Sequence, residues 1–188
     1  RGQIELAKDA VLESFCFSAG PRLNRYDLEV VLAGERAEAE LNGLYLTKSG
    51  QTVDHHTTIY HAVPNAVSKQ LYKGILDGDS RGVFNGKVVV NRDAQGTSAK
   101  QLNRNLLLSA DAEIDTKPEL LIDADDVKCA HGASIGQLDD DQIFYLRSRG
   151  LRVDEARRLL AVAFADEVLM KVPYVRDWLR PLIMEYFA

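Results

Sequence analysis

The sequence contains few cysteines: Cys16 and Cys129 are the only two among 188 residues. Two cysteines are too few for a disulfide framework, which favours a reducing compartment, so we expect a cytoplasmic protein. The sequence also has no apolar run close to the roughly 18 residues that a membrane-spanning helix needs. The first ten residues, RGQIELAKDA, lack the apolar segment of a signal peptide. We therefore expect no membrane partner.

Positive charge and aromatic side chains are also scarce. There are 23 Lys and Arg against 28 Asp and Glu, a formal net charge of −5, which argues against binding to nucleic acid. Aromatic residues make up 7% of the chain and are scattered, whereas a carbohydrate-binding groove would be lined with them. No Gly-x-x-x-x-Gly-Lys-Ser/Thr loop is present, so we expect that the chain does not hydrolyse ATP.

The rest of the composition is that of an ordinary globular protein. Hydrophobic residues make up 46% and charged residues 27%, and the length is enough to bury a sizeable core. The chain begins with arginine and enters patterned sequence at once. We therefore expect a fragment that lacks the N-terminal part of a longer protein.

Short segments with strand-like alternation dominate the first 133 residues, and little helical periodicity lies between them. We count about a dozen candidate strands, including residues 112–115 and 119–122 as two separate ones. A sandwich, a barrel or a β-helix could each produce this spacing. The short turns, and the type of side chain expected to point into the coil, favour a mainly β protein built as a right-handed parallel β-helix. The side chains expected to point inward are small or polar, which suits stacked ladders: Ser68, Thr97, Ser98, Asn103 and Asn105.

A weak internal repeat supports the same interpretation. Asn42-Gly43-Leu44 recurs as Asn85-Gly86-Lys87-Val88, a spacing of 43 residues. Two coils of about 21 residues each would produce that spacing. Asn42-Gly43 is also a strong turn pair, so we expect a turn there.

The pattern becomes helical after Gly136. We expect helices at residues 140–149, 154–169 and 174–187, with Tyr145 and Trp178 among the inward candidates and a kink or break at Pro181. The chain thus divides into a β-helix core, residues 1–137, and a helical domain, residues 138–188. Five arginines lie near the junction of the first two helices and form either a solvated face or a docking surface: Arg147, Arg149, Arg152, Arg157 and Arg158.

Cys129 and His131 are the main candidate site. Two residues apart on a strand, their side chains share one face. A thiol beside an imidazole suits soft metal ions or sulfur chemistry. The alternative is that Cys129 is a small core residue and His131 its hydrogen-bonded neighbour.

Two other groups of residues are candidate sites. His55 and His61 share a strand face but lie too far apart on it to hold a metal ion with His56, so we expect no zinc there. An acidic cluster at Asp123, Asp125 and Asp126 could serve a β-helix enzyme that acts on carbohydrate. A solvated turn explains these carboxylates more simply. A plain structural solenoid is the third class of function.

Longer segments of the sequence resemble the C-terminal part of the SufB/SufD family of iron–sulfur cluster assembly proteins. KCAHGASIG, followed by a helix that begins with Glu-Ala-Arg, is the most specific part of the resemblance. The segments that carry it are SKQLYKGILDGDSRGVFNGKVVV (68–90), SAKQLNRNLLLS (98–109), DADDVKCAHGASIGQLDDDQIFYLRSRGL (123–151) and DEARRLLAVAFADEVL (154–169).

The resemblance implies a β-helix core followed by a small helical domain, and a role as a non-catalytic subunit of a SufBCD complex. His131 matches the histidine that takes part in building a nascent cluster at the interface with SufB, and Cys129 is its motif neighbour. Residues 154–169 match the helix that docks the SufC ATPase. We expect the docking residues to be Arg157, Arg158, Leu159, Ala163 and Phe164, with both arginines exposed.

The same resemblance implies that an iron–sulfur cluster is transient and forms in the full complex. The Cys129/His131 pair supplies at most two of the roughly four ligands that a cluster needs. We expect the isolated fragment to hold none. Without SufB, the fragment is expected to pair with a second copy of itself.

Overall fold

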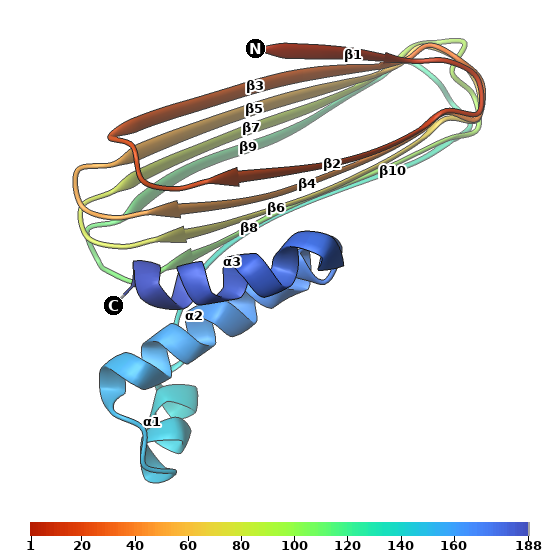
Figure 1. Ribbon diagram of the computed structural model, residues 1–188. Helices are drawn as coiled ribbons and strands as arrows, with labels where there is room; N and C mark the ends of the chain where they lie inside the picture. The colour runs from red at the N-terminus through yellow and green to blue at the C-terminus, as the bar shows by residue number, and fades with distance from the viewer. Residues whose placement is uncertain (188) are drawn as a thin grey trace.

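The computed structural model describes residues 1–187, and its first 137 residues form ten strands wound into coils. The odd-numbered strands form one parallel five-stranded sheet and the even-numbered strands form the other, so the chain alternates between two facing sheets (Figure 1). This arrangement confirms the parallel β-helix. The strands are β1 Gly2–Leu6, β2 Val11–Ser18, β3 Leu23–Leu32, β4 Glu38–Thr47, β5 Thr52–His61, β6 Val67–Leu76, β7 Arg81–Val90, β8 Thr97–Leu107, β9 Glu113–Ile122 and β10 Val127–Gln137.

The coil is longer than the sequence repeat suggested. Glu38 pairs with Val67, which is 29 residues later, so one coil takes about 29 residues rather than about 21. Asn42 lies in β4 and Asn85 in β7, on opposite sheets, so their spacing of 43 residues is not a number of whole coils. The two strands expected at residues 112–115 and 119–122 are one strand, β9.

The turn expected at Asn42-Gly43 was also wrong, because both residues lie in the middle of β4. Gly43 serves packing between coils instead. A Cβ atom at this position would overlap the ring of Tyr72, the neighbouring residue in register on β6. Glycine is required there by the close approach of a large buried side chain.

The interior of the coil holds hydrogen-bonded polar side chains as well as apolar ones. Ser68, Thr97, Asn103 and Asn105 are buried as expected, whereas Ser98 is only half-buried. The hydroxyl of Tyr45 donates to Oδ1 of Asn105 at 2.5 Å, and Nδ2 of Asn105 donates to Oδ1 of Asn103 at 2.6 Å. These bonds, one between β4 and β8 and one within β8, satisfy groups that would otherwise be costly to bury.

Three helices follow the strands: α1 Asp140–Ser148, α2 Val153–Leu169 and α3 Pro173–Tyr186. Asp139 caps α1 by accepting a hydrogen bond from the backbone N–H of Asp141, and Gly150 follows the helix with a φ of +96°. Pro181 does not split α3, which is continuous from Pro173 to Tyr186. None of the helices within residues 1–187 is long and apolar enough to cross a membrane.

Helices α2 and α3 lie against the outer face of the even-numbered sheet (Figure 1). Their buried residues form one hydrophobic cluster with outward-facing residues of β4, β6 and β8. A buried lysine adds a polar link: Nζ of Lys73 donates to Oε2 of Glu167 and to the carbonyl oxygen of Phe164, each at 2.6 Å. Arg104 holds the same carboxylate at 2.9 Å. The helices are thus fixed to the strands by both apolar and ionic contacts.

Candidate functional site

Strand β10, which carries Cys129 and His131, is the edge strand of its sheet. It pairs with β8 on one side, and β9 is likewise the last strand of the other sheet. Cys129 is in register with Ala99 and His131 with Gln101, and both of these neighbours are buried inside the coil. Cys129 and His131 therefore face the interior side of the last coil, where no further coil in residues 1–187 covers them.

The two side chains share a face, as their spacing predicted, but their surroundings differ. Cys129 is half-buried and His131 is exposed. Burial raises the pKa of the Cys129 thiol, and a backbone hydrogen bond with Ala99 offsets part of that effect. The thiol is therefore protonated at neutral pH, and a metal or sulfur species that binds it must displace the proton.

The pair supplies two of the ligands that a metal ion or cluster would need. Among residues 1–187, no group of three or more His, Cys, Asp or Glu side chains is placed to hold a metal ion. Cys16 lies on β2, at the opposite edge of the same sheet, so it cannot join Cys129. A soft metal or cluster wants about four ligands. The remaining ligands of such a site would lie outside residues 1–187.

The last coil also exposes large apolar side chains. Ile135 is 51% exposed, Leu121 47% and Ile122 38%. Ile122 and Leu121 lie on β9 and Ile135 on β10. An edge strand with unpaired backbone groups and exposed apolar side chains is suited to pair with another chain.

The predicted docking residues on α2 occupy three different environments. Leu159 and Ala163 are exposed one helical turn apart. The Phe164 ring is half-buried against the solenoid, with Nζ of Lys73 3.8 Å from its centroid. Arg158 is half-buried rather than exposed as expected. Arg157 is exposed, but its guanidinium donates to the carbonyl oxygen of Leu108, so it also ties α2 to the strands.

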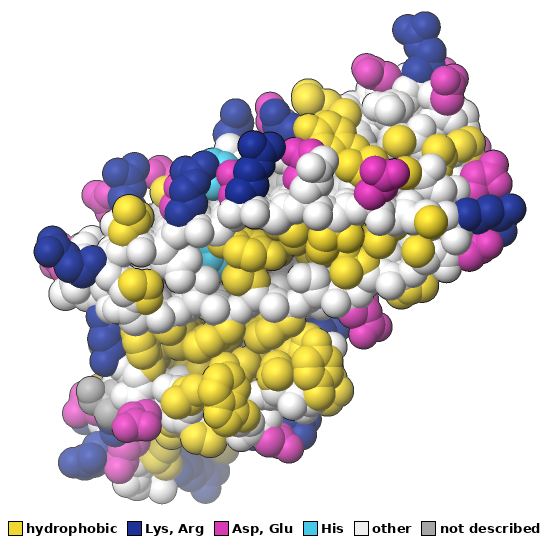
Figure 2. Space-filling model, turned by 45° about the horizontal axis from the view of Figure 1, so that its top comes forward, with side chains coloured by type: hydrophobic (Ala, Val, Ile, Leu, Met, Phe, Trp, Pro, Cys, Tyr) yellow, Lys and Arg dark blue, Asp and Glu magenta, His cyan; other side chains and the backbone are white. Residues whose placement is uncertain are grey.

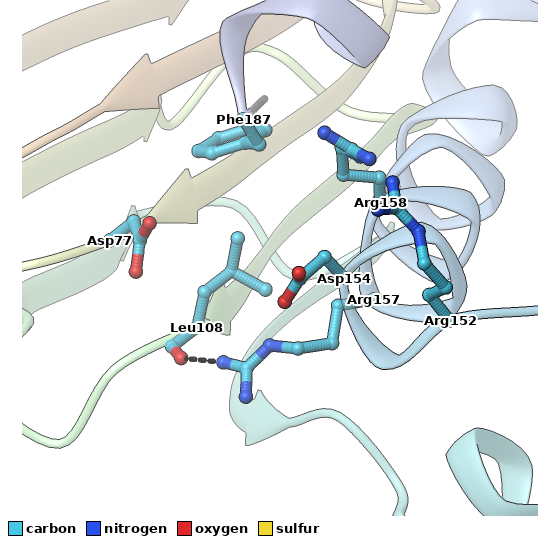
Figure 3. Close-up of a pocket in the computed structure, with 7 residues that line it drawn as sticks. All are labelled: Asp77, Leu108, Arg152, Asp154, Arg157, Arg158 and Phe187. Atoms are coloured by element: carbon cyan, nitrogen blue, oxygen red, sulfur yellow. Dashed lines mark hydrogen bonds between the residues drawn. The ribbon is translucent and has the colours of Figure 1, made fainter. Parts of the chain in front are cut away.

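The first turn of α2 borders a cleft of about 420 Å³ (Figure 3). Side chains of both charges line it, and in the close-up Asp154 and Arg157 extend from α2 toward Leu108. Two of the five junction arginines, Arg147 and Arg149, belong to α1 and its C-terminal end and do not line this cleft. The lining residues are Asp77, Leu108, Arg152, Asp154, Arg157, Arg158 and Phe187.

Sequence reasoning missed the exposed aromatic residues of α1 and α3. Trp178 is 66% exposed and Tyr145 57%, although both were inward candidates. Tyr174, Trp178 and Leu182, four residues apart along α3, form an exposed apolar stripe beside the buried residues Leu179 and Ile183. Hydrophobic side chains accordingly gather over the helical part of the molecule (Figure 2). The spacing of four residues between Tyr174, Trp178 and Leu182 is the sequence signal that could have revealed this exposed stripe.

Comparison with known proteins identifies the family. The family model described as "SUF system FeS cluster assembly, SufBD core domain" matches residues 1–164. The chain belongs to the SufBD family of iron–sulfur cluster assembly proteins. The match includes all ten strands, α1 and most of α2, and therefore the Cys129/His131 pair.

Curated relatives of this SufBD-family chain support the assignment. A SufBD family protein of Synechocystis is 48% identical over 82% of this chain, and the Escherichia coli assembly protein SufD is 41% identical over 87%. The chloroplastic protein ABCI7 of Arabidopsis thaliana is 43% identical over 87% of the chain. The chain spans between 34% and 38% of the length of these three relatives.

Proposed function

We propose that this chain is part of a non-catalytic subunit of a SufBCD-type complex and contributes Cys129 and His131 to a site where an iron–sulfur cluster is built. The observation that supports this most is the position of the pair on the uncovered interior side of the last coil. Two ligands there are too few for a cluster but are well placed to share one with a facing chain. The cluster is cargo that forms transiently and leaves.

The facing chain in this proposal is a SufB-like subunit that pairs with the β9/β10 edge. Unpaired backbone groups along the edge would bond to a strand of the partner, and the apolar side chains Leu121, Ile122 and Ile135 would be covered. Without that partner, the same edge would accept a second copy of this chain. We therefore expect a two-fold dimer by light scattering for the chain alone, and a monomer at every accessible concentration would count against the use of this edge.

The most direct test of the assembly role is co-purification. The full-length protein that carries this chain would be mixed with SufB-like and SufC-like subunits, one of which is tagged. We expect a ternary complex to be recovered, and a Leu121→Lys, Ile135→Lys variant to lose the SufB-like subunit while keeping the SufC-like one. Recovery of neither subunit by the unaltered protein would contradict the proposal.

The proposed docking surface for the SufC-like ATPase is the exposed side of the helices, with Leu159 and Ala163 of α2 near its centre. Leu159→Asp is expected to weaken binding of the ATPase at least about tenfold, because a charge would have to be buried against the partner. Isothermal titration would measure the affinity. Leu159 is a better choice than Arg157, whose contact with Leu108 makes its replacement a perturbation of packing as well.

The matched control for that measurement is Glu35→Lys in the turn between β3 and β4, which changes an exposed charge far from the helices. It should bind the ATPase with the affinity of the unaltered protein. Equal affinities for Leu159→Asp and the control would remove α2 from the docking surface.

A further inference from the structure

One row of inward side chains in the even-numbered sheet leads to His131. Leu41, Gln70, Gln101 and His131 occupy successive positions in register across four strands. Neighbouring strands lie about 4.8 Å apart, so these side chains stack along the coil axis. Oγ1 of Thr57 donates to Oε1 of Gln70 at 2.9 Å, and Nε2 of Gln101 donates to the same oxygen at 3.5 Å.

The side-chain amides of Gln70 and Gln101 form a short hydrogen-bonded ladder that has one unpaired polar atom at each end. Nε2 of Gln70 and Oε1 of Gln101 are buried and have no hydrogen-bond partner within residues 1–187. In a stack of amides, each group donates to one neighbour and accepts from the other. Leu41, next to Gln70, has no side-chain acceptor to offer. His131, next to Gln101, has ring N–H groups that can donate.

The position of Gln101 is fixed by its neighbours, whereas that of His131 is not. Gln101 is completely buried, and a Cβ atom at Gly86 on the facing sheet would overlap its Nε2. His131 is exposed, and Oε1 of Gln101 has no hydrogen bond with it or with any other group in residues 1–187. Of the two side chains, the exposed imidazole is therefore the one that is free to turn, while the acceptor stays in place.

We propose that Gln101 is the positioning residue of His131. When a facing subunit covers the last coil, Oε1 of Gln101 accepts a hydrogen bond from one ring N–H of His131. The other ring nitrogen then has no proton, faces the shared space and is free to bind iron. Histidines that bind metals depend on such a second bond for their tautomer and ring orientation. This inference rests on the proposed function, in which His131 is a ligand to the cluster under construction.

The test compares variants in the assembled complex of the full-length protein with its SufB-like and SufC-like partners. Gln101→Met removes the acceptor and keeps the volume. We expect it to assemble normally but to retain roughly 10- to 100-fold less iron and sulfide per complex after reconstitution. Content is measured per assembled complex, so a lower yield of folded protein does not affect the ratio.

Two further variants separate positioning from packing. Gln101→Glu should restore cluster content, because burial raises the pKa of a carboxyl group and keeps it neutral. The neutral acid can donate to Gln70 and accept from His131. Thr57→Val removes a hydrogen bond from the same ladder without touching Gln101, and should leave cluster content unchanged.

A spectroscopic measurement reports the bond itself. This chain contributes four histidines, and with ¹⁵N-labelled histidine in this subunit alone, the ring signals that disappear in His131→Ala identify those of His131. We expect the His131 ring to hold one tautomer in the unaltered complex and in Gln101→Glu, and a mixture of both in Gln101→Met.

The outcomes distinguish this inference from the function on which it rests. Loss of the cluster in His131→Ala but full content in Gln101→Met would overturn the role of Gln101 and leave the proposed function standing. Equal losses in Gln101→Met and Thr57→Val would show that the ladder only packs. Full content in His131→Ala would overturn both.

Discussion

Replacing Glu167 with alanine is expected to destabilise the protein by about 2–3 kcal/mol, because it leaves the ammonium of Lys73 buried without its counter-ion. The side chain of Lys73 is 2% exposed, and that of Glu167 is 43% exposed, so the effect should be smaller than the roughly 3–5 kcal/mol of a fully buried pair. Burial lowers the pKa of Lys73, and the hydrogen bond and charge of Glu167 raise it again. Removing the carboxylate thus removes most of what keeps this lysine charged.

Chemical denaturation would measure this loss, and a double variant would identify its cause. Lys73→Met together with Glu167→Ala should recover most of the lost free energy of unfolding, since no buried charge is then left unpaired. Glu185→Ala, an exposed carboxylate on α3, is the matched control and should change stability by less than about 0.5 kcal/mol. If Glu167→Ala behaved like that control, the Lys73 link would contribute nothing to the docking of α2.

Acidification from pH 6.5 to pH 4 is expected to remove roughly 3 kcal/mol of stability for each of two buried histidines. Burial lowers the pKa of His55 to about 4; the charge of Asp54 raises this pKa by a smaller amount, and that of His56 lowers it slightly further. Burial likewise lowers the pKa of His61 to about 4. The Nδ1 atoms of His55 and His61 are buried without a partner in residues 1–187, so protonation would leave each new N–H unpaired.

The direction of the pH effect follows from proton counts. Between pH 4 and 6.5 the unfolded chain binds protons at these histidines and the folded chain does not, so stability rises with pH throughout that window. The stabilisation is fully present above pH 6.5 and is lost as the pH falls toward 4. Denaturation midpoints at several pH values would show it. His61→Gln should flatten the slope by about half, whereas Thr58→Ser, on the outer side of β5, should not. Equal slopes for all three proteins would refute the assignment.

The sequence predicted the features that depend on strand periodicity. Alternation along residues 127–137 was enough to place Cys129 and His131 on one face; only the register with the buried Ala99 and Gln101 shows that this face is the interior one. The three helices begin and end within one residue of their expected bounds, because capping residues such as Asp139 and Gly150 act locally.

The features that failed depend on contacts between distant parts of the chain. The turn preference of Asn42-Gly43 was overridden by the ring of Tyr72, which needs the space of a missing Cβ. Trp178 lies on the exposed side of α3 because Leu179 and Ile183 already fill the side that packs. The bond of Arg157 to the Leu108 carbonyl could not be foreseen either, since 49 residues separate the two.

The measurement that tests the central claim most directly is cluster formation by the assembled complex when His131 is replaced with alanine. Ser134→Ala, an exposed change on the same strand, is the matched control. We expect His131→Ala to fold, to co-purify with its SufB-like and SufC-like partners, and to retain almost no iron or sulfide after reconstitution. Cys129→Ala should do less harm, and the control should match the unaltered complex. Full iron and sulfide content in the His131→Ala complex, or stoichiometric iron and sulfide on this chain alone, would contradict a site shared across the β10 edge.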